Sequence, residues 1–112
     1  SAESAGPAPD PERCLAAFSQ LLQRMMPLVS DFLSAPPTLK VREMKSRWGV
    51  CYPGRNQILL NTRLLTRSVE EQEYVMLHEL VHFLHPDHQA GFHAEMARRM
   101  PDYRARREKL RR

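Results

Sequence analysis

The residues best suited to chemistry are the five histidines, which all lie between positions 78 and 93 of the 112-residue chain. Two of them, His78 and His82, are four residues apart, so on a helix they lie one above the other on the same face. Two imidazoles at this spacing can bind one zinc ion. Glu79 follows the first of them, where its carboxylate can take a proton from a water molecule. This H-E-x-x-H pattern predicts metal-assisted hydrolysis, with His78 and His82 as ligands and Glu79 as the general base.

A catalytic zinc site usually has three protein ligands and one open position. His88 lies six residues after His82 and just beyond Pro86, which cannot continue a helix. Reversal of the chain near this proline would bring the imidazole of His88 back toward the metal. We therefore predict His88 as the third ligand, beside His78 and His82.

Three further residues compete for the third position. His85 is seven residues after His78, which places it roughly 10 Å further along a helix and too far away to share one ion. We expect His85 to have a packing or supporting role. His93 and Glu95, on the next expected helix, remain possible in place of His88.

The helix that carries the pattern has a clear start. Ser68 can accept a hydrogen bond from the backbone N–H of Glu71, and the Glu71 carboxylate can reach back, which is a capping box. The following segment, through Leu84, is apolar around much of its circumference, which predicts a largely buried helix. Two more helices are expected downstream, over residues 90–100 and from Pro101 onward.

The N-terminal part predicts a leader and one helix. Residues 1–9, rich in proline and small side chains, are typical of a flexible leader. Asp10 followed by Pro11 is a favourable helix start, because an acceptor caps the helix and proline suits its first turn. Pro27 should kink or divide this helix.

Three short strands are expected between the helices. The patterns cover residues 38–44, 47–52 and 57–61, and the last two are joined by a turn at residues 53–56. A hairpin closing a small, about three-stranded sheet follows from this spacing. The predicted fold class is α+β, in a single domain over residues 10–112.

Net charge, cysteine content and the length of apolar runs limit the partners and the location that the protein can have. The net charge is +4, and the positive excess lies in residues 98–112, which predicts a solvated helix face; nucleic acid is a second, less favoured partner. Cys14 and Cys51 have no disulfide or metal-binding spacing, so a reducing compartment such as the cytoplasm is expected. No apolar run reaches the roughly 20 residues of a membrane span.

From about Leu39 to Leu110, the sequence resembles the YgjP-like metal-dependent hydrolases, which are related to the SprT-like zinc metallopeptidases. The resemblance follows the chain in order over most of its length. The matching residues are Met44-Lys45-Ser46-Arg47-Trp48-Gly49-Val50-Cys51, Ile58-Leu59-Leu60-Asn61, Arg63-Leu64, Tyr74-Val75, His78-Glu79-Leu80-Val81-His82, His85, His88, Phe92 and Met100-Pro101-Asp102-Tyr103.

This resemblance implies a zincin-type fold, peptide-bond hydrolysis, the three ligands His78, His82 and His88, and Glu79 as the catalytic base. It also implies that the chain corresponds to the C-terminal part of the usual family length. The chain departs from the family at two positions: Val50 stands where serine is usual, and His93 stands where tryptophan is usual.

Four further residues near the predicted site have less specific expectations. Trp48, beside a glycine in a strand, is expected to pack in the core. Arg47 could bind a carboxylate, either of a structural partner or of a substrate terminus. Tyr74 and Tyr103 could each donate to an oxyanion, although a core or capping role is favoured for both.

The leading hypothesis is a zinc-dependent hydrolase that acts on peptide or protein substrates. A second hypothesis is a binding or scaffold domain in which zinc has only a structural role. A third is a DNA-associated protease of the SprT-like kind. A metal-free interpretation makes His78 and His82 hydrogen-bonded core histidines and Glu79 a solvated acid.

Overall fold

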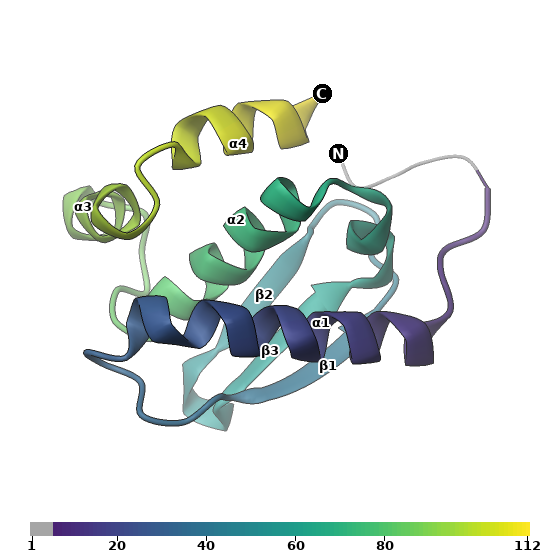
Figure 1. The fold of residues 1–112 in the computed structure, drawn as a ribbon, viewed down its shortest axis with the longest axis horizontal. Helices are drawn as coiled ribbons and strands as arrows, with labels where there is room; N and C mark the ends of the chain where they lie inside the picture. Colours follow the sequence, from purple (N-terminus) through teal and green to yellow (C-terminus); the bar gives the residue numbers. More distant parts are fainter. Residues whose placement is uncertain (1–5) are drawn as a thin grey trace.

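The computed structural model describes residues 6–112, and residues 1–5 of the predicted leader lie outside this range. It has the predicted α+β architecture, with an N-terminal helix, a three-stranded sheet and C-terminal helices (Figure 1). Short 3₁₀ helices follow α1, β2 and β3. In chain order the main elements are α1 (Pro11–Met25), β1 (Thr38–Arg42), β2 (Gly49–Tyr52), β3 (Gln57–Asn61), α2 (Val69–Val81), α3 (Ala90–Arg99) and α4 (Tyr103–Arg111).

The three strands form a mixed sheet in the order β1-β3-β2. The predicted hairpin is confirmed: β2 pairs antiparallel with β3, with Gly49 opposite Leu60 and Tyr52 opposite Gln57. Asn56 closes the turn in the left-handed conformation, at a φ of 51°, which asparagine tolerates better than most residues. β1 runs parallel to β3, a pairing that the local strand pattern does not reveal.

Two capping predictions agree with the structure. The Asp10 carboxylate accepts a hydrogen bond from the backbone N–H of Arg13 at the start of α1. The Ser68 hydroxyl accepts from the Glu71 backbone N–H, and the Glu71 carboxylate accepts from the Ser68 N–H in return. Pro27 divides the first helix as expected, because α1 ends at Met25 and a 3₁₀ turn continues through the proline.

The end of α2 differs from the prediction. The helix ends at Val81 rather than continuing through Leu84, whose side chain is exposed. The next backbone N–H groups, of His82, Phe83 and Leu84, each donate to the carbonyl three residues back. These shorter bonds tighten the final turn before Pro86 is reached, so the chain leaves the helix one turn early.

One face of the sheet is covered by two adjacent helices. α1 packs over β1 and α2 packs over β2, while α4 lies on α2 and α3 lies near the C-terminal end of α2 (Figure 1). α2 is therefore packed on most sides, which explains why its sequence is apolar around much of its circumference. Its Met76, Leu77, Leu80 and Val81 are fully buried in the core.

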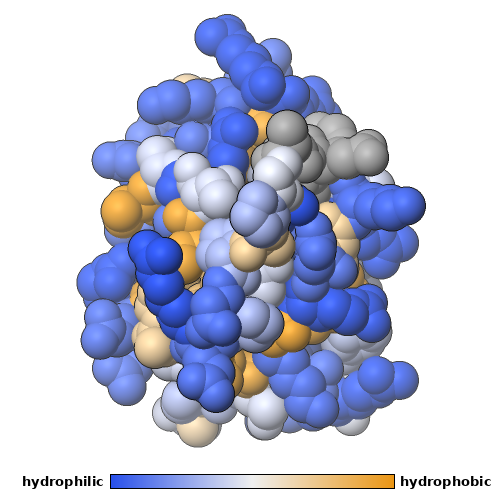
Figure 2. Space-filling view, turned by 90° about the vertical axis from the view of Figure 1, so that its right-hand side faces the viewer, coloured by the Kyte–Doolittle hydropathy of each residue, from blue (hydrophilic) through white to orange (hydrophobic). Residues whose placement is uncertain are grey.

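The outer surface is largely polar on the face shown in Figure 2. Hydrophilic side chains cover most of that face, and hydrophobic surface occurs there in small separate patches. Within residues 6–112, no helix combines the length and the apolar character needed to cross a membrane.

Asn61 is the buried polar residue that shapes the connection between β1 and β2. Its side-chain amide donates to the backbone carbonyls of Met44 and Arg47, both at 2.8 Å. Its side-chain oxygen accepts from the backbone N–H groups of Met44 and Arg63. Because Asn61 engages both backbone groups of Met44, the strand predicted to reach Met44 ends earlier, at Arg42.

We predict that Asn61→Ala lowers the free energy of unfolding by about 2–4 kcal/mol, because several buried backbone groups lose their partners together. Urea denaturation measures this change. Asn61→Asp should also destabilise the protein, since it lacks the amide donor and introduces a buried charge. A loss below about 1 kcal/mol for Asn61→Ala would show that the loop does not depend on these bonds.

Candidate metal centre and its cleft

The three predicted ligands lie together in the structure. His78 is on α2, His82 caps its end, and the loop after the tight turn carries His88 back toward both. The Nε2 atom of His88 is 3.0 Å from Nε2 of His78 and 3.0 Å from Nε2 of His82. Within residues 6–112, these three side chains form the group whose ligand atoms are close enough to hold a metal ion.

The surroundings favour the neutral rings that a metal requires. The backbone carbonyl of His85 accepts a hydrogen bond from Nδ1 of His82 at 3.0 Å, so the hydrogen of the neutral ring sits on Nδ1. Nε2 of His82 is then free to act as a ligand. Burial lowers the pKa of His78 to about 3 and also lowers the pKa of His82.

The donor set fits a divalent transition-metal ion such as zinc. Two nitrogens that are each about 2.0–2.1 Å from such an ion are about 2.8–3.4 Å apart for ligand angles from about 90° to about 109°, and the 3.0 Å spacings around His88 lie in this range. The Nε2 of His82 carries no hydrogen, so within the group only Nε2 of His78 and Nε2 of His88 could donate a hydrogen bond. A cation satisfies all three lone pairs at once, which the rings cannot do for one another.

Phe92 supports the three imidazoles from α3. Its ring centroid lies 4.9 Å from that of His78, 4.8 Å from that of His82 and 5.0 Å from that of His88. The periodicity of the sequence indicates that Phe92 is a core residue, but it does not indicate that the ring contacts all three histidines. This apolar platform limits how far each imidazole can rotate.

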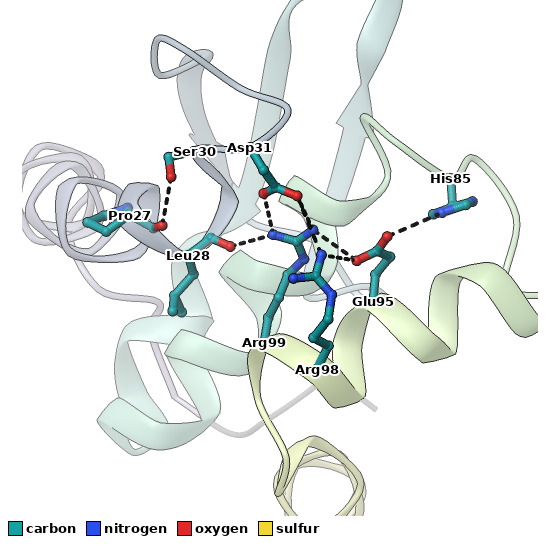
Figure 3. A network of polar contacts seen from close by, with 8 residues as sticks. All are labelled: Pro27, Leu28, Ser30, Asp31, His85, Glu95, Arg98 and Arg99. Carbon is teal, nitrogen blue, oxygen red and sulfur yellow. Dashed lines mark hydrogen bonds and ion pairs between the residues drawn. The ribbon is translucent and has the colours of Figure 1, made fainter.

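Glu95, one of the competing candidates for the third ligand, lies in a different network (Figure 3). Its carboxylate accepts hydrogen bonds from Arg98 and Arg99, and it is 4.0 Å from the ring of His85. Arg99 also binds Asp31 through two nitrogens and so joins α3 to the segment after α1. The network holds the helix that carries Phe92.

His93, the second competing candidate, also lies outside the three-histidine group. Its Nδ1 atom is 3.0 Å from the hydroxyl of Tyr103, which is buried. Tyr74 is buried as well, and its ring stacks on that of His78 with 5.8 Å between the centroids. The two tyrosines therefore pack around the group from the side of α4 and α2.

His85 lies beside the three-histidine group rather than in it. It contributes its backbone carbonyl to His82, while its ring packs close to Gly91 at the start of α3. A Cβ atom at Gly91 would come within 2.8 Å of that ring, so the glycine makes room for it.

Glu79 lies beside the histidines and is 5% exposed. Burial raises the pKa of Glu79 to about 8, and the charge of Arg47 opposes that rise. A cation held by the three imidazoles would further favour the ionised carboxylate. Gly49 of β2 lies against Glu79, and a Cβ atom there would come within 3.1 Å of its Cγ and Oε2.

The histidines and Glu79 line a cleft of about 530 Å³ between α2 and β2. Val50 and Cys51 form part of its wall. Burial, followed by the charge of Glu79, raises the pKa of Cys51 to about 12. This thiol is therefore uncharged at neutral pH and unsuited to nucleophilic attack.

Trp48 is only partly the core residue that its sequence context predicts. It packs against the core but remains partly exposed, where it lines a second pocket next to Glu79. It directly precedes β2, which is at the edge of the sheet, so no neighbouring strand covers it on that side.

Several arginines of the basic C-terminal segment are paired within the molecule. Arg99 binds Asp31 and Glu95, and Arg106 binds Glu73 and Asp102. Arg99 and Arg106 are therefore structural ion-pair partners rather than parts of the solvated face that the sequence predicts, since their side chains are only 3% and 20% exposed.

The α+β fold, the three converging imidazoles and the buried carboxylate together define a metallohydrolase-type site. Residues 11–112 match the family model described as the YgjP-like metallopeptidase domain, and the chain belongs to this family. The predicted family is thereby confirmed, and the chain is a metallopeptidase-like hydrolase. No curated protein matches the sequence significantly.

Two solved structures are similar in fold. The metallopeptidase zymogen abylysin of Pyrococcus abyssi superposes with a TM-score of 0.71 and 18% identity, over 82% of this chain and 90% of that one. The metallopeptidase zymogen jannalysin of Methanocaldococcus jannaschii gives a TM-score of 0.68 and 18% identity, over 82% and 91% respectively. At this identity the likeness shows a shared fold, and it confirms the predicted zincin-like class.

We predict that Gly49→Ala lowers the free energy of unfolding by about 1–3 kcal/mol, because the new methyl group overpacks Glu79 and Leu60. Metal content should not change, since the histidines are not displaced. Gly54→Ala is the matched control, because a Cβ atom there meets nothing within 4 Å. Equal unfolding energies for the two variants would contradict the close contact at Gly49.

Proposed function

We propose that the protein is a zinc-dependent peptidase in which His78, His82 and His88 bind the metal and Glu79 is the general base. One observation carries this proposal: three imidazole nitrogens converge beside a buried carboxylate in an open cleft. Neutral imidazoles suit several transition metals, and three histidines with an open position form one of the known ligand sets of catalytic zinc.

Each residue has a defined task. When bound, zinc acidifies water and polarises a carbonyl group. Glu79 accepts a hydrogen bond from the attacking water, takes its proton and transfers that proton to the departing amine nitrogen. Gly49 and Phe92 restrict the carboxylate and the imidazoles to the positions that these transfers require.

The cleft also supports an extended peptide as the substrate. β2 is an edge strand, and among the described strands it pairs only with β3. A peptide can therefore add to its free side through backbone hydrogen bonds and pass the histidines, because Gly49, Val50 and Cys51 line the cleft.

We also infer a cytoplasmic location. The inference is supported by Cys14 and Cys51, which form no disulfide in the structure, as expected in a reducing compartment.

We predict that Glu79→Gln retains the metal but lowers kcat/KM by about 10²–10⁴-fold, because the amide cannot accept the proton. A quenched fluorogenic peptide library provides the substrates, and mass spectrometry locates the bond that is cleaved. Glu70→Gln, an exposed position on the same helix, is the control. Full activity in metal-loaded Glu79→Gln would exclude Glu79 as the base.

Metal analysis after dialysis tests the ligand assignment. We expect about one equivalent of zinc in the wild-type protein and at least a tenfold weaker affinity in His88→Ala, because the site loses one of its three ligands. His93→Ala and Glu95→Ala should keep the metal. If Glu95→Ala loses zinc while His88→Ala retains it, the assignment of the third ligand is wrong.

A further inference from the structure

A second pocket, of about 310 Å³, adjoins the metal cleft. The two hollows share Arg47, Gly49, His78 and Glu79, so they meet at the proposed base. The second pocket is enclosed by α2, by α4 and by the segment around Trp48. We call it the arginine pocket and define it by six lining residues: Arg47, Trp48, Tyr74, Arg107, Leu110 and Arg111.

The charges in this pocket are unbalanced. It contains three arginines, and Glu79 is the one acidic residue among those that line it. A ligand that enters from the cleft therefore meets an excess of positive charge. Such a local field favours an anionic group over a neutral one.

Arg107 lacks the partners that neighbouring arginines have. Arg106, the preceding residue, binds both Glu73 and Asp102. Within residues 6–112 the structure gives Arg107 no ion pair, and its Nε atom is buried without a hydrogen-bond partner. The positive charge of Arg107 is thus left without an acidic partner among these residues, and a carboxylate supplied by a ligand in the pocket would provide one.

Arg107 and Arg111 also line a smaller hollow of about 220 Å³, together with Tyr74 and His78. Among the residues that the structure describes, Arg111 has one weak ion pair, 3.9 Å from Glu108, and both side chains of that pair are exposed. Arg111 is therefore free to turn toward a ligand in the pocket.

The remaining walls are apolar or aromatic. Trp48, Tyr74 and Leu110 enclose the space between the arginines. Such walls exclude water and so strengthen an ion pair between a guanidinium group and a carboxylate. They also accommodate the carbon chain that carries the carboxylate.

We propose that the arginine pocket binds a carboxylate of the peptide substrate, held by Arg107 with Arg47 and Arg111. This inference rests on the proposed peptidase function and names the substrate class: peptides that place a carboxylate next to the cleaved bond. The carboxylate can belong to an acidic side chain or to the C-terminus of the peptide. Both sources present the planar oxygen pair that a guanidinium group binds.

A binding experiment tests the pocket without any need for catalysis. Trp48 is the only tryptophan of the chain, so its fluorescence reports on the pocket directly. The probes are 3-phenylpropionate and its neutral amide, 3-phenylpropanamide, each titrated into metal-loaded and metal-free protein. We expect the carboxylate to bind at least about tenfold more tightly than the amide in both forms, and more weakly at high salt.

Variants identify the residue responsible. Arg107→Gln should weaken binding of 3-phenylpropionate about tenfold or more, while binding of the amide stays the same. Arg104→Gln is the control, because Arg104 is exposed on the same helix and lines none of the pockets described here. Circular dichroism and thermal melting verify that both variants are folded. If binding requires the metal and is unchanged in Arg107→Gln, the anion binds at the metal centre and the proposal is wrong.

Peptide pairs then distinguish the two sources of the carboxylate. One pair differs by glutamate or glutamine beside the cleaved bond, and the other by a free or an amidated C-terminus. We expect one member to be preferred by about tenfold or more in kcat/KM, mainly through KM, and Arg107→Gln to abolish the preference. Preference for the free C-terminus indicates a carboxypeptidase, and preference for glutamate indicates an acidic side-chain subsite. Cleavage without preference overturns the pocket assignment alone, whereas Arg107-dependent binding without any cleavage overturns the peptidase proposal alone.

Discussion

The imidazole nitrogens of His78, His82 and His88 approach one another to 3.0 Å around His88, and such an approach becomes unfavourable when more than one ring is protonated. Burial opposes such protonation, because it lowers the pKa values of His78 and His82. The packing of the surrounding helices contributes to this burial. α2 is packed between α1, α4 and the sheet, and Phe92 closes the histidine group from α3. A more open arrangement would let the histidines protonate and repel one another.

The cleft depends on how the sheet meets α2. β2 can lie close to the helix because Gly49 has no side chain to separate it from Glu79. The connection into β2 is fixed in turn by Asn61, whose amide holds the backbone carbonyls of Met44 and Arg47. On the opposite side, the Asp31–Arg99–Glu95 network ties α3 to the segment after α1. The cleft wall and the histidine platform are thus held by two separate sets of polar contacts.

Structural features that are determined by residues close together in the chain could be predicted from the sequence. These include the caps at Asp10 and Ser68, the break at Pro27, the hairpin and the family, each of which depends on residue types at short spacing. Features that depend on distant contacts could not be predicted. The parallel pairing of β1 with β3, for example, requires knowledge of the crossover. The early end of α2 is a local feature that the sequence pattern also missed, because its hydrogen bonds change from the i→i−4 to the i→i−3 kind before Pro86 is reached. The placement of Phe92 beneath three rings and of Arg107 beside the cleft arises only when α3 and α4 fold back on α2.

The tight turn after Val81 has a further consequence for His82, its first residue. The group that fixes the hydrogen of His82 on Nδ1 is a main-chain carbonyl, that of residue 85. In many metal sites a carboxylate side chain has this role, and replacing that side chain changes the ligand. Here the orientation of the His82 ring is set by the path of the backbone. The side chain at position 85 is therefore free to vary without altering which nitrogen of His82 faces the metal, provided that the turn keeps its shape.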